Sequence, residues 1–132
     1  MNSPPAVFLI DDDAAIQQTF EDLLGAWGIH VRSYYSAEAF LEGYRDDWTG
    51  CLIVDVRMLG ISGFDLLKEL RSRGIALPAI LMSGHGDATW EQEAIQAGAL
   101  AFLEKPFRVE QLKECLACHC PEVFLQANKP GL

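Results

Sequence analysis

Positive charge is scarce in this sequence. Ten lysines and arginines stand against 19 aspartates and glutamates, which gives a formal net charge of −9. Because nucleic acids are bound by basic surfaces, this balance argues against direct binding of nucleic acid. Long apolar runs are also missing, and none approaches the ~20 residues that a membrane-spanning helix needs. The composition therefore predicts a chain that binds neither nucleic acid nor membrane directly.

Cysteine is limited to four residues, and three of them crowd together at positions 115, 118 and 120. This spacing is not that of the disulfide framework of a small secreted domain. The N-terminal residues, MNSPPAV, lack the basic part and the long apolar part of a secretion signal. We therefore expect a soluble, cytoplasmic protein in a reducing compartment.

The stretch CLACH, residues 115–119, matches the C-x-x-C-H pattern of haem attachment. It also continues a helical pattern that begins at Val109, and one short helix cannot aim four ligands at a single tetrahedral metal. The pattern puts Cys120 on the inner face of this helix and Cys118 roughly opposite. We expect ordinary helix packing with one exposed thiol, and no haem.

Short apolar runs alternate with amphipathic stretches five times. The apolar runs predict strands over residues 6–10, 29–34, 51–56, 77–83 and 100–104. Each is followed by a stretch with helical spacing, and the last two of these cover 87–99 and 108–119. This alternation predicts an α/β fold, a doubly wound parallel sheet with helices on both faces. Residues 1–120 form one domain in this interpretation, and 121–132 form a loosely ordered tail or the start of a linker.

Polar side chains follow four of the predicted strands at the point where each strand ends. They are Asp11, Asp12 and Asp13 after the first strand, Asp55 at the end of the third, Ser83 at the end of the fourth, and Lys105 after the fifth. In an open parallel sheet, ligands bind outside the carboxyl ends of the strands. We therefore expect these side chains to converge on one edge of the sheet.

Each of these residue types suits phosphoryl chemistry. Clustered carboxylates repel one another unless a cation offsets their charge, and Mg²⁺ prefers such oxygen ligands. A carboxylate can also attack phosphorus, while a lysine and a hydroxyl can hold the phosphoryl oxygens. Each residue taken alone also has a structural interpretation: Asp13 as a helix cap, Ser83 as a turn residue and Lys105 as a solvated loop residue. Asp55 is harder to explain structurally, because a lone buried charge is costly.

The same residues lie where the sequence resembles the receiver domain of two-component response regulators. The resemblance covers about residues 6–119 and rests on the order and spacing of DD after the first strand, DVRM, MSGHGD and AGALAFLEKPF. It is strongest for receivers linked to helix-turn-helix transcriptional output domains. It implies a flavodoxin-like fold with five helices around five parallel strands in the order 2-1-3-4-5.

The resemblance also implies roles for individual residues. Asp55 would accept the phosphoryl group. Asp11 and Asp12 would hold Mg²⁺, which Mn²⁺ can replace, together with Asp55 and the backbone carbonyl of Arg57. Asp13 remains a helix cap.

Three further residues would respond to the phosphoryl group. Ser83 would turn its hydroxyl toward it, Phe102 would rotate inward as that hydroxyl moves, and Lys105 would pair with the phosphoryl oxygens. The Lys105–Pro106 peptide is expected to be cis.

The implied function is signalling and not enzymatic turnover of a substrate. A sensor histidine kinase would donate the phosphoryl group, small phosphodonors could replace the kinase, and self-dephosphorylation would reset the domain. The surface over residues 87–119 would then switch, form a homodimer and control an output such as transcription.

Two alternatives compete with this interpretation. Asp11 and Asp13, one residue apart after an apolar strand, also suit the nucleophile and the acid–base residue of a haloacid-dehalogenase-like phosphohydrolase. That family needs a further acidic motif after its lysine, and it leaves Asp55 unexplained. A phosphorylation-independent adaptor of the receiver fold is the other alternative, although such a protein would normally have lost one of the site residues.

Overall fold

The computed structural model describes residues 4–58, 60–84 and 88–127 of the chain. At its centre is a parallel five-stranded sheet in the order β2-β1-β3-β4-β5. The strands are β1 (Ala6–Ile10), β2 (Val31–Tyr34), β3 (Gly50–Asp55), β4 (Ala79–Ser83) and β5 (Ala101–Glu104). The predicted fold class and strand order are confirmed.

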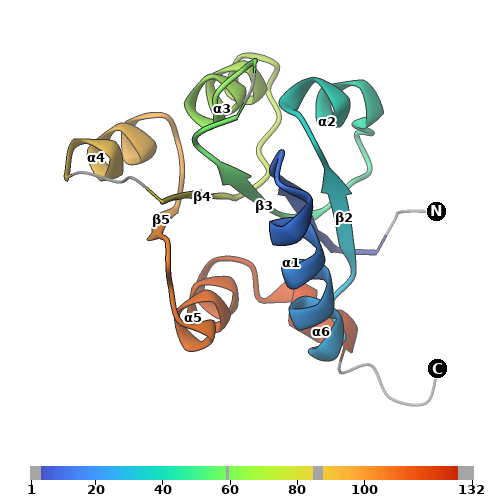
Figure 1. Ribbon diagram of the computed structural model, residues 1–132. Helices are drawn as coiled ribbons and strands as arrows, with labels where there is room; N and C mark the ends of the chain where they lie inside the picture. Colours follow the sequence, from blue (N-terminus) through green and yellow to red (C-terminus); the bar gives the residue numbers. More distant parts are fainter. Residues whose placement is uncertain (1–3, 59, 85–87, 128–132) are drawn as a thin grey trace.

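Helices cover both faces of this sheet (Figure 1). One face carries α1 (Ala14–Ala26), α5 (Val109–His119) and α6 (Glu122–Ala127). The other carries α2 (Ala37–Gly43), α3 (Gly63–Ser72) and α4 (Ala88–Gln96). Since all five strands are parallel, the helices α1, α2, α3 and α4 that connect successive strands serve as crossovers and return the chain to the same end of the sheet.

The two central strands, β1 and β3, are buried along their whole length. Successive side chains alternate between the two faces, so Val7 and Leu9 enter the core beneath α1 and α5 while Phe8 and Ile10 enter the core beneath α2 and α3. On the second face Phe8 stacks on Trp48 with ring centroids 5.0 Å apart. Burial on both faces is why these strands read as uninterrupted apolar runs.

One glycine lets α3 start close against the end of β3. A Cβ atom on Gly63 would lie 2.7 Å from the carbonyl oxygen of Asp55, closer than such atoms approach. Ser62 caps the helix by accepting the N–H of Asp65 at 3.1 Å. The segment that follows Asp55 is therefore held tightly beneath the edge of the sheet.

The C-terminal residues differ from the prediction. Within the expected tail, residues 122–127 form α6, so the part of the chain that the structure describes has six helices around the sheet and not five. Val123 is fully buried, and Phe124 lies against Trp27 of α1 with ring centroids 6.4 Å apart. The helix therefore exists because it covers apolar surface at the end of α1.

Two cysteines lie as the helical pattern predicts. Cys120, the C-cap of α5, is buried and Cys118 is exposed, which confirms their opposite orientation. The thiol of Cys51 on β3 donates to the carbonyl of Leu52 at 3.4 Å, and its interaction with the Cys120 thiol, together with burial, raises the pKa of Cys51 well above its ordinary value. Burial likewise raises the pKa of the half-buried Cys115, to about 11.

Candidate functional site

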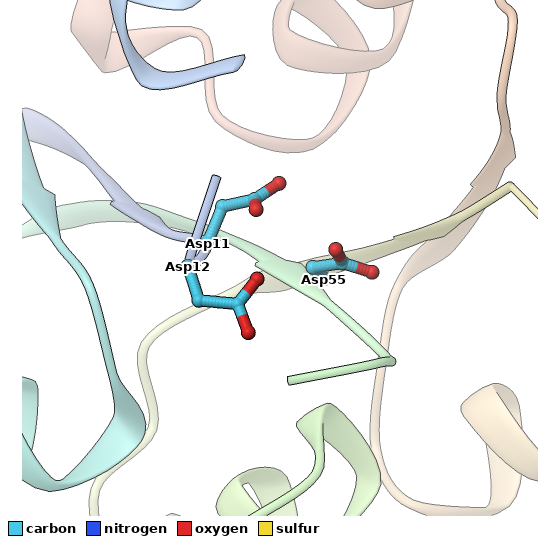
Figure 2. Close-up of side chains that lie close together, drawn as sticks. All are labelled: Asp11, Asp12 and Asp55. Atoms are coloured by element: carbon cyan, nitrogen blue, oxygen red, sulfur yellow. The ribbon is translucent and has the colours of Figure 1, made fainter. Parts of the chain in front are cut away.

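Three carboxylates gather at the carboxyl edge of the sheet. Asp11 and Asp12 follow β1, Asp55 ends β3, and one oxygen from each lies within 4.8 Å of the other two. Figure 2 shows the three side chains around a common space. Asp11 and Asp55 are buried while Asp12 is exposed, so the space is open on one side.

Backbone N–H groups orient the two buried carboxylates. Asp11 Oδ1 accepts the N–H of Asp13 at 2.9 Å, and Asp55 Oδ1 accepts the N–H of Arg57 at 3.1 Å. Each bond spans two residues, so the strand end and the following turn fix the carboxylate together. The second oxygen of each carboxylate remains directed toward Lys105.

The ammonium of Lys105 lies between these two carboxylates. Its Nζ is 3.4 Å from Asp11 Oδ2 and 3.5 Å from Asp55 Oδ2, and its side chain is 22% exposed. Together with Asp12, these side chains carry a net charge of −2 when all four are ionised. Burial raises the pKa of Asp11 and the neighbouring charge of Asp55 raises it further, whereas the N–H of Asp13 and Lys105 act in the opposite direction.

This arrangement fits a small divalent cation. The oxygens are close enough for shared coordination, they are hard ligands, and their charge exceeds what Lys105 neutralises. Burial raises the pKa of Asp11, and a cation bound beside it would favour the ionised carboxylate. Asp11, Asp12 and Asp55 are the side chains that could hold such an ion.

Strands β4 and β5 bring two more of the predicted residues to this edge. Ser83 is fully buried at the end of β4, and its carbonyl accepts the N–H of Lys105 at 2.7 Å. Phe102 lies on β5, half-buried against the core beneath α2, α3 and α4. The Lys105–Pro106 peptide is cis, as expected.

Asp13 has a different role from Asp11 and Asp12. Its Oδ1 accepts the N–H groups of Ala15 at 2.8 Å and Ile16 at 3.3 Å, which confirms that it is the N-cap of α1. A hydrolase acid–base residue would have to face the same ligand as Asp11. The hydrolase alternative built on Asp11 and Asp13 is therefore not supported.

The sequence analysis did not identify Gln17. This buried amide on α1 donates from Nε2 to the carbonyl of Asp11 at 3.0 Å and to that of Tyr34 at 2.9 Å. It joins the ends of β1 and β2 where the strands diverge. A polar residue between Ile16 and Phe20, on the apolar side of the helix, was the signal in the sequence.

A stack beside the end of β3 was also missed. The guanidinium of Arg57 lies over the ring of Trp90 on α4, and that ring meets Phe64 of α3 edge to face. The spacing of these three residues does not predict a contact, because they come from three separate segments.

Comparison with known proteins gives a consistent result. The family model for the response regulator receiver domain matches residues 7–117. The transcriptional regulatory protein FixJ of Azorhizobium caulinodans is 48% identical over 101 residues, which are 76% of this chain and 48% of that protein. The response regulator protein TodT of Pseudomonas putida is 41% identical over 106 residues, which are 80% of this chain and 47% of that protein.

Solved structures agree with these relatives. The crystal structure of FixJ-N has a TM-score of 0.76 and 31% identity, and the match covers 98% of this chain and 99% of that one. The response regulator StyR has a TM-score of 0.84 and 34% identity, with 90% of this chain and 60% of that chain covered. The chain spans about half the length of the curated relatives it matches. Among the described residues, every helix is too short or too polar to cross a membrane.

Proposed function

The chain belongs to the receiver domain family of response regulators, and from this we propose that it accepts a phosphoryl group on Asp55 in a Mg²⁺-dependent manner. The observation that carries the proposal is the meeting of Asp11, Asp12 and Asp55 with Lys105 at one edge of the sheet. A purely structural strand end would not collect three carboxylates around a single ammonium. An adaptor that no longer takes a phosphoryl group would not need them either.

Mg²⁺ would be held by Asp11, Asp12 and Asp55, with the carbonyl of Arg57 as a further ligand, and Mn²⁺ would substitute for it. When bound, the ion supplies positive charge that stabilises the oxygens of a phosphoryl group. The chain's own contribution is placement, because the N–H of Arg57 holds one oxygen of Asp55 while the other faces Lys105, where a phosphoryl group would be received.

The transfer would begin with Asp55 Oδ2 attacking the phosphorus of a phosphohistidine. A P–O bond forms as the P–N bond breaks, and the departing imidazole nitrogen takes the electron pair and then a proton. Lys105, now 3.5 Å from that carboxylate oxygen, would pair with the transferred oxygens. Attack by water on the same phosphorus would return the carboxylate and inorganic phosphate.

The response would involve Ser83 and Phe102. Ser83 ends the strand beside β3 and could turn its hydroxyl toward a phosphoryl group on Asp55. Phe102 lies on the next strand and is half-buried, so an inward rotation would bury more of its ring. We propose that these movements change the surface of α4, β5 and α5 and favour a homodimer there.

The donor would be a sensor histidine kinase, and the output would be transcription, as in the relative FixJ, whose name, transcriptional regulatory protein, states that role. The receiver itself would cover residues 1–120 and act in the cytoplasm, without binding nucleic acid or membrane. Its net charge of −9 supports an output carried out by another part of a longer protein.

Intact-mass measurement tests the proposal. The full chain is incubated with acetyl phosphate and Mg²⁺, and the wild type is expected to gain the mass of one phosphoryl group. Asp55→Asn should gain none, and chelation of Mg²⁺ should abolish the gain. Asp22→Asn, which removes an exposed carboxylate of α1, is the matched control and should behave as wild type. Equal uptake by wild type and Asp55→Asn would eliminate Asp55, and no uptake by either would eliminate the function.

A further inference from the structure

Arg57 contacts two parts of the molecule at once. Its backbone N–H donates to Asp55 Oδ1 at 3.1 Å, and its guanidinium carbon lies 5.4 Å from the ring centroid of Trp90. The residue is exposed, so folding does not bury its charge. One residue therefore joins the acceptor carboxylate to the first turn of α4.

Trp90 is fixed from the other side by α3. Its ring meets that of Phe64 at an interplanar angle of 88°, with centroids 6.3 Å apart. Such edge-to-face pairs define the orientation of both rings. The stack of Arg57, Trp90 and Phe64 thus connects the loop after β3, α4 and α3.

The stack borders the acidic site. A hollow of about 520 Å³ is lined by Asp12 together with Arg57, Phe64 and Trp90. Arg57 therefore borders the same hollow as the exposed carboxylate of the cluster, and its side chain is long and flexible enough to turn toward it. The aromatic ring and the acidic site are two alternative partners for the same cation.

Phosphorylation would change which partner is favoured. In the unmodified protein the ring offers a weak attraction to an exposed cation. A phosphoryl group brings about two negative charges and three acceptor oxygens, and guanidinium binds such groups through paired, charge-assisted hydrogen bonds. The second interaction is the stronger one, so the guanidinium should leave the ring.

We propose that Arg57 is a positioning residue that holds Trp90 and α4 while Asp55 is unmodified and releases them when it pairs with the phosphoryl oxygens. This inference rests on the proposed phosphorylation of Asp55. It gives α4 a direct mechanical link to the acceptor loop, separate from any movement of Ser83 and Phe102. The side chain of Arg57 has two positions, one on the ring of Trp90 and one at the phosphoryl oxygens, and the charge of the phosphoryl group favours the second.

Fluorine NMR of the full chain labelled with fluorotryptophan can follow this link, because the chain has three tryptophans and Trp90→Phe assigns one resonance. Beryllofluoride with Mg²⁺ serves as the phosphoryl mimic. In the wild type, the Trp90 resonance should move on activation. In Arg57→Met it should already be displaced before activation, and its further movement should fall by more than half. Arg57→Lys, which keeps a cation, should respond between these two.

A matched control exists on the opposite face of the sheet. Lys113 lies over Trp27, also at 5.4 Å, far from the acidic cluster. Lys113→Met should shift the Trp27 resonance and leave the response of Trp90 unchanged. Intact mass after acetyl phosphate treatment is measured on every variant, so a failure of phosphorylation is seen separately. Normal phosphate uptake with a Trp90 response in Arg57→Met equal to that of wild type would overturn the inference.

Discussion

Replacing Asp11 with asparagine should stabilise the metal-free protein. Asp11 is fully buried, and its carboxylate lies within 4.8 Å of those of Asp12 and Asp55 and 3.4 Å from the ammonium of Lys105. At an effective dielectric constant of about 20, the attraction is about 5 kcal/mol and each repulsion about 3.5 kcal/mol. Solvent weakens the repulsion from the exposed Asp12, so the attraction to Lys105 and the two repulsions nearly cancel.

The cost of burying the charge then decides the sign. Taking a carboxylate out of water costs several kcal/mol even after relaxation. Asparagine avoids most of this cost and still offers an Oδ1 atom to the N–H of Asp13. We expect Asp11→Asn to be more stable by about 1–3 kcal/mol, which for 132 residues corresponds to a rise in Tm of about 4–10 °C.

The effect should depend on pH. Because the folded chain holds the Asp11 proton more tightly than the unfolded chain, wild-type stability falls as pH rises from about 3.8 through the raised pKa of the folded state. Asp11→Asn lacks this loss, so the two proteins should differ most above that window and converge below pH 3.8. Urea unfolding at several pH values, in the presence of a chelator, measures the difference.

Mg²⁺ should reverse the order of stability. At a Mg²⁺ concentration about a thousandfold above its dissociation constant, the wild type should gain about 4.1 kcal/mol, which exceeds the metal-free advantage of Asp11→Asn, and the variant should gain much less. Asp22→Asn, with an exposed carboxylate removed, should stay within about 0.5 kcal/mol of wild type throughout. If metal-free Asp11→Asn were less stable than wild type at neutral pH, or if both gained equally from Mg²⁺, the electrostatic account of the site would be wrong.

Three further predictions concern other parts of the chain. Lys105→Gln should lower metal-free stability by about 2–3 kcal/mol, because two buried carboxylates lose their shared ammonium, and Mg²⁺ should restore most of it in a thermal melt. Maleimide should label Cys118 rapidly in the native protein and Cys115 slowly, with a Cys115 rate that rises with pH toward its pKa of about 11; equal rates at neutral pH would contradict this. Gly63→Ala should cost about 1–3 kcal/mol and slow phosphate uptake, since its Cβ would press on the carbonyl that ends β3, whereas Gly25→Ala, with open space around it, should do neither.

The sequence was sufficient for the sheet and for the convergence of the site. Strands buried on both faces leave an apolar signature, and parallel strands place their final residues at one edge, so Asp11 and Asp55 could be brought together without coordinates. Helix α6 was missed because six residues after Pro121 are too few to show a helical period. Its formation depends on the apolar surface that Val123 covers, which is a tertiary property.

The contacts that support the site could not be predicted from the sequence, because they too depend on tertiary packing. The spacing of Gln17 marks it as a polar residue on the apolar side of α1, but it does not reveal the two carbonyls that the side chain binds at the ends of β1 and β2. The stack of Arg57 on Trp90 joins segments 33 residues apart through side-chain geometry alone. Motifs indicate which residues carry the chemistry, whereas the supporting contacts emerge only from packing.

The two hydrogen bonds that Gln17 donates to backbone carbonyls have a consequence for any movement in this domain. They tie Asp11 and Tyr34 to α1, so the carboxyl ends of β1 and β2 are held by a helix as well as by each other. We expect a disturbance that starts at Asp55 to displace this flank less than β4, β5 and α4. An asymmetric frame of this kind would direct the effect of a local change of charge toward a single flank.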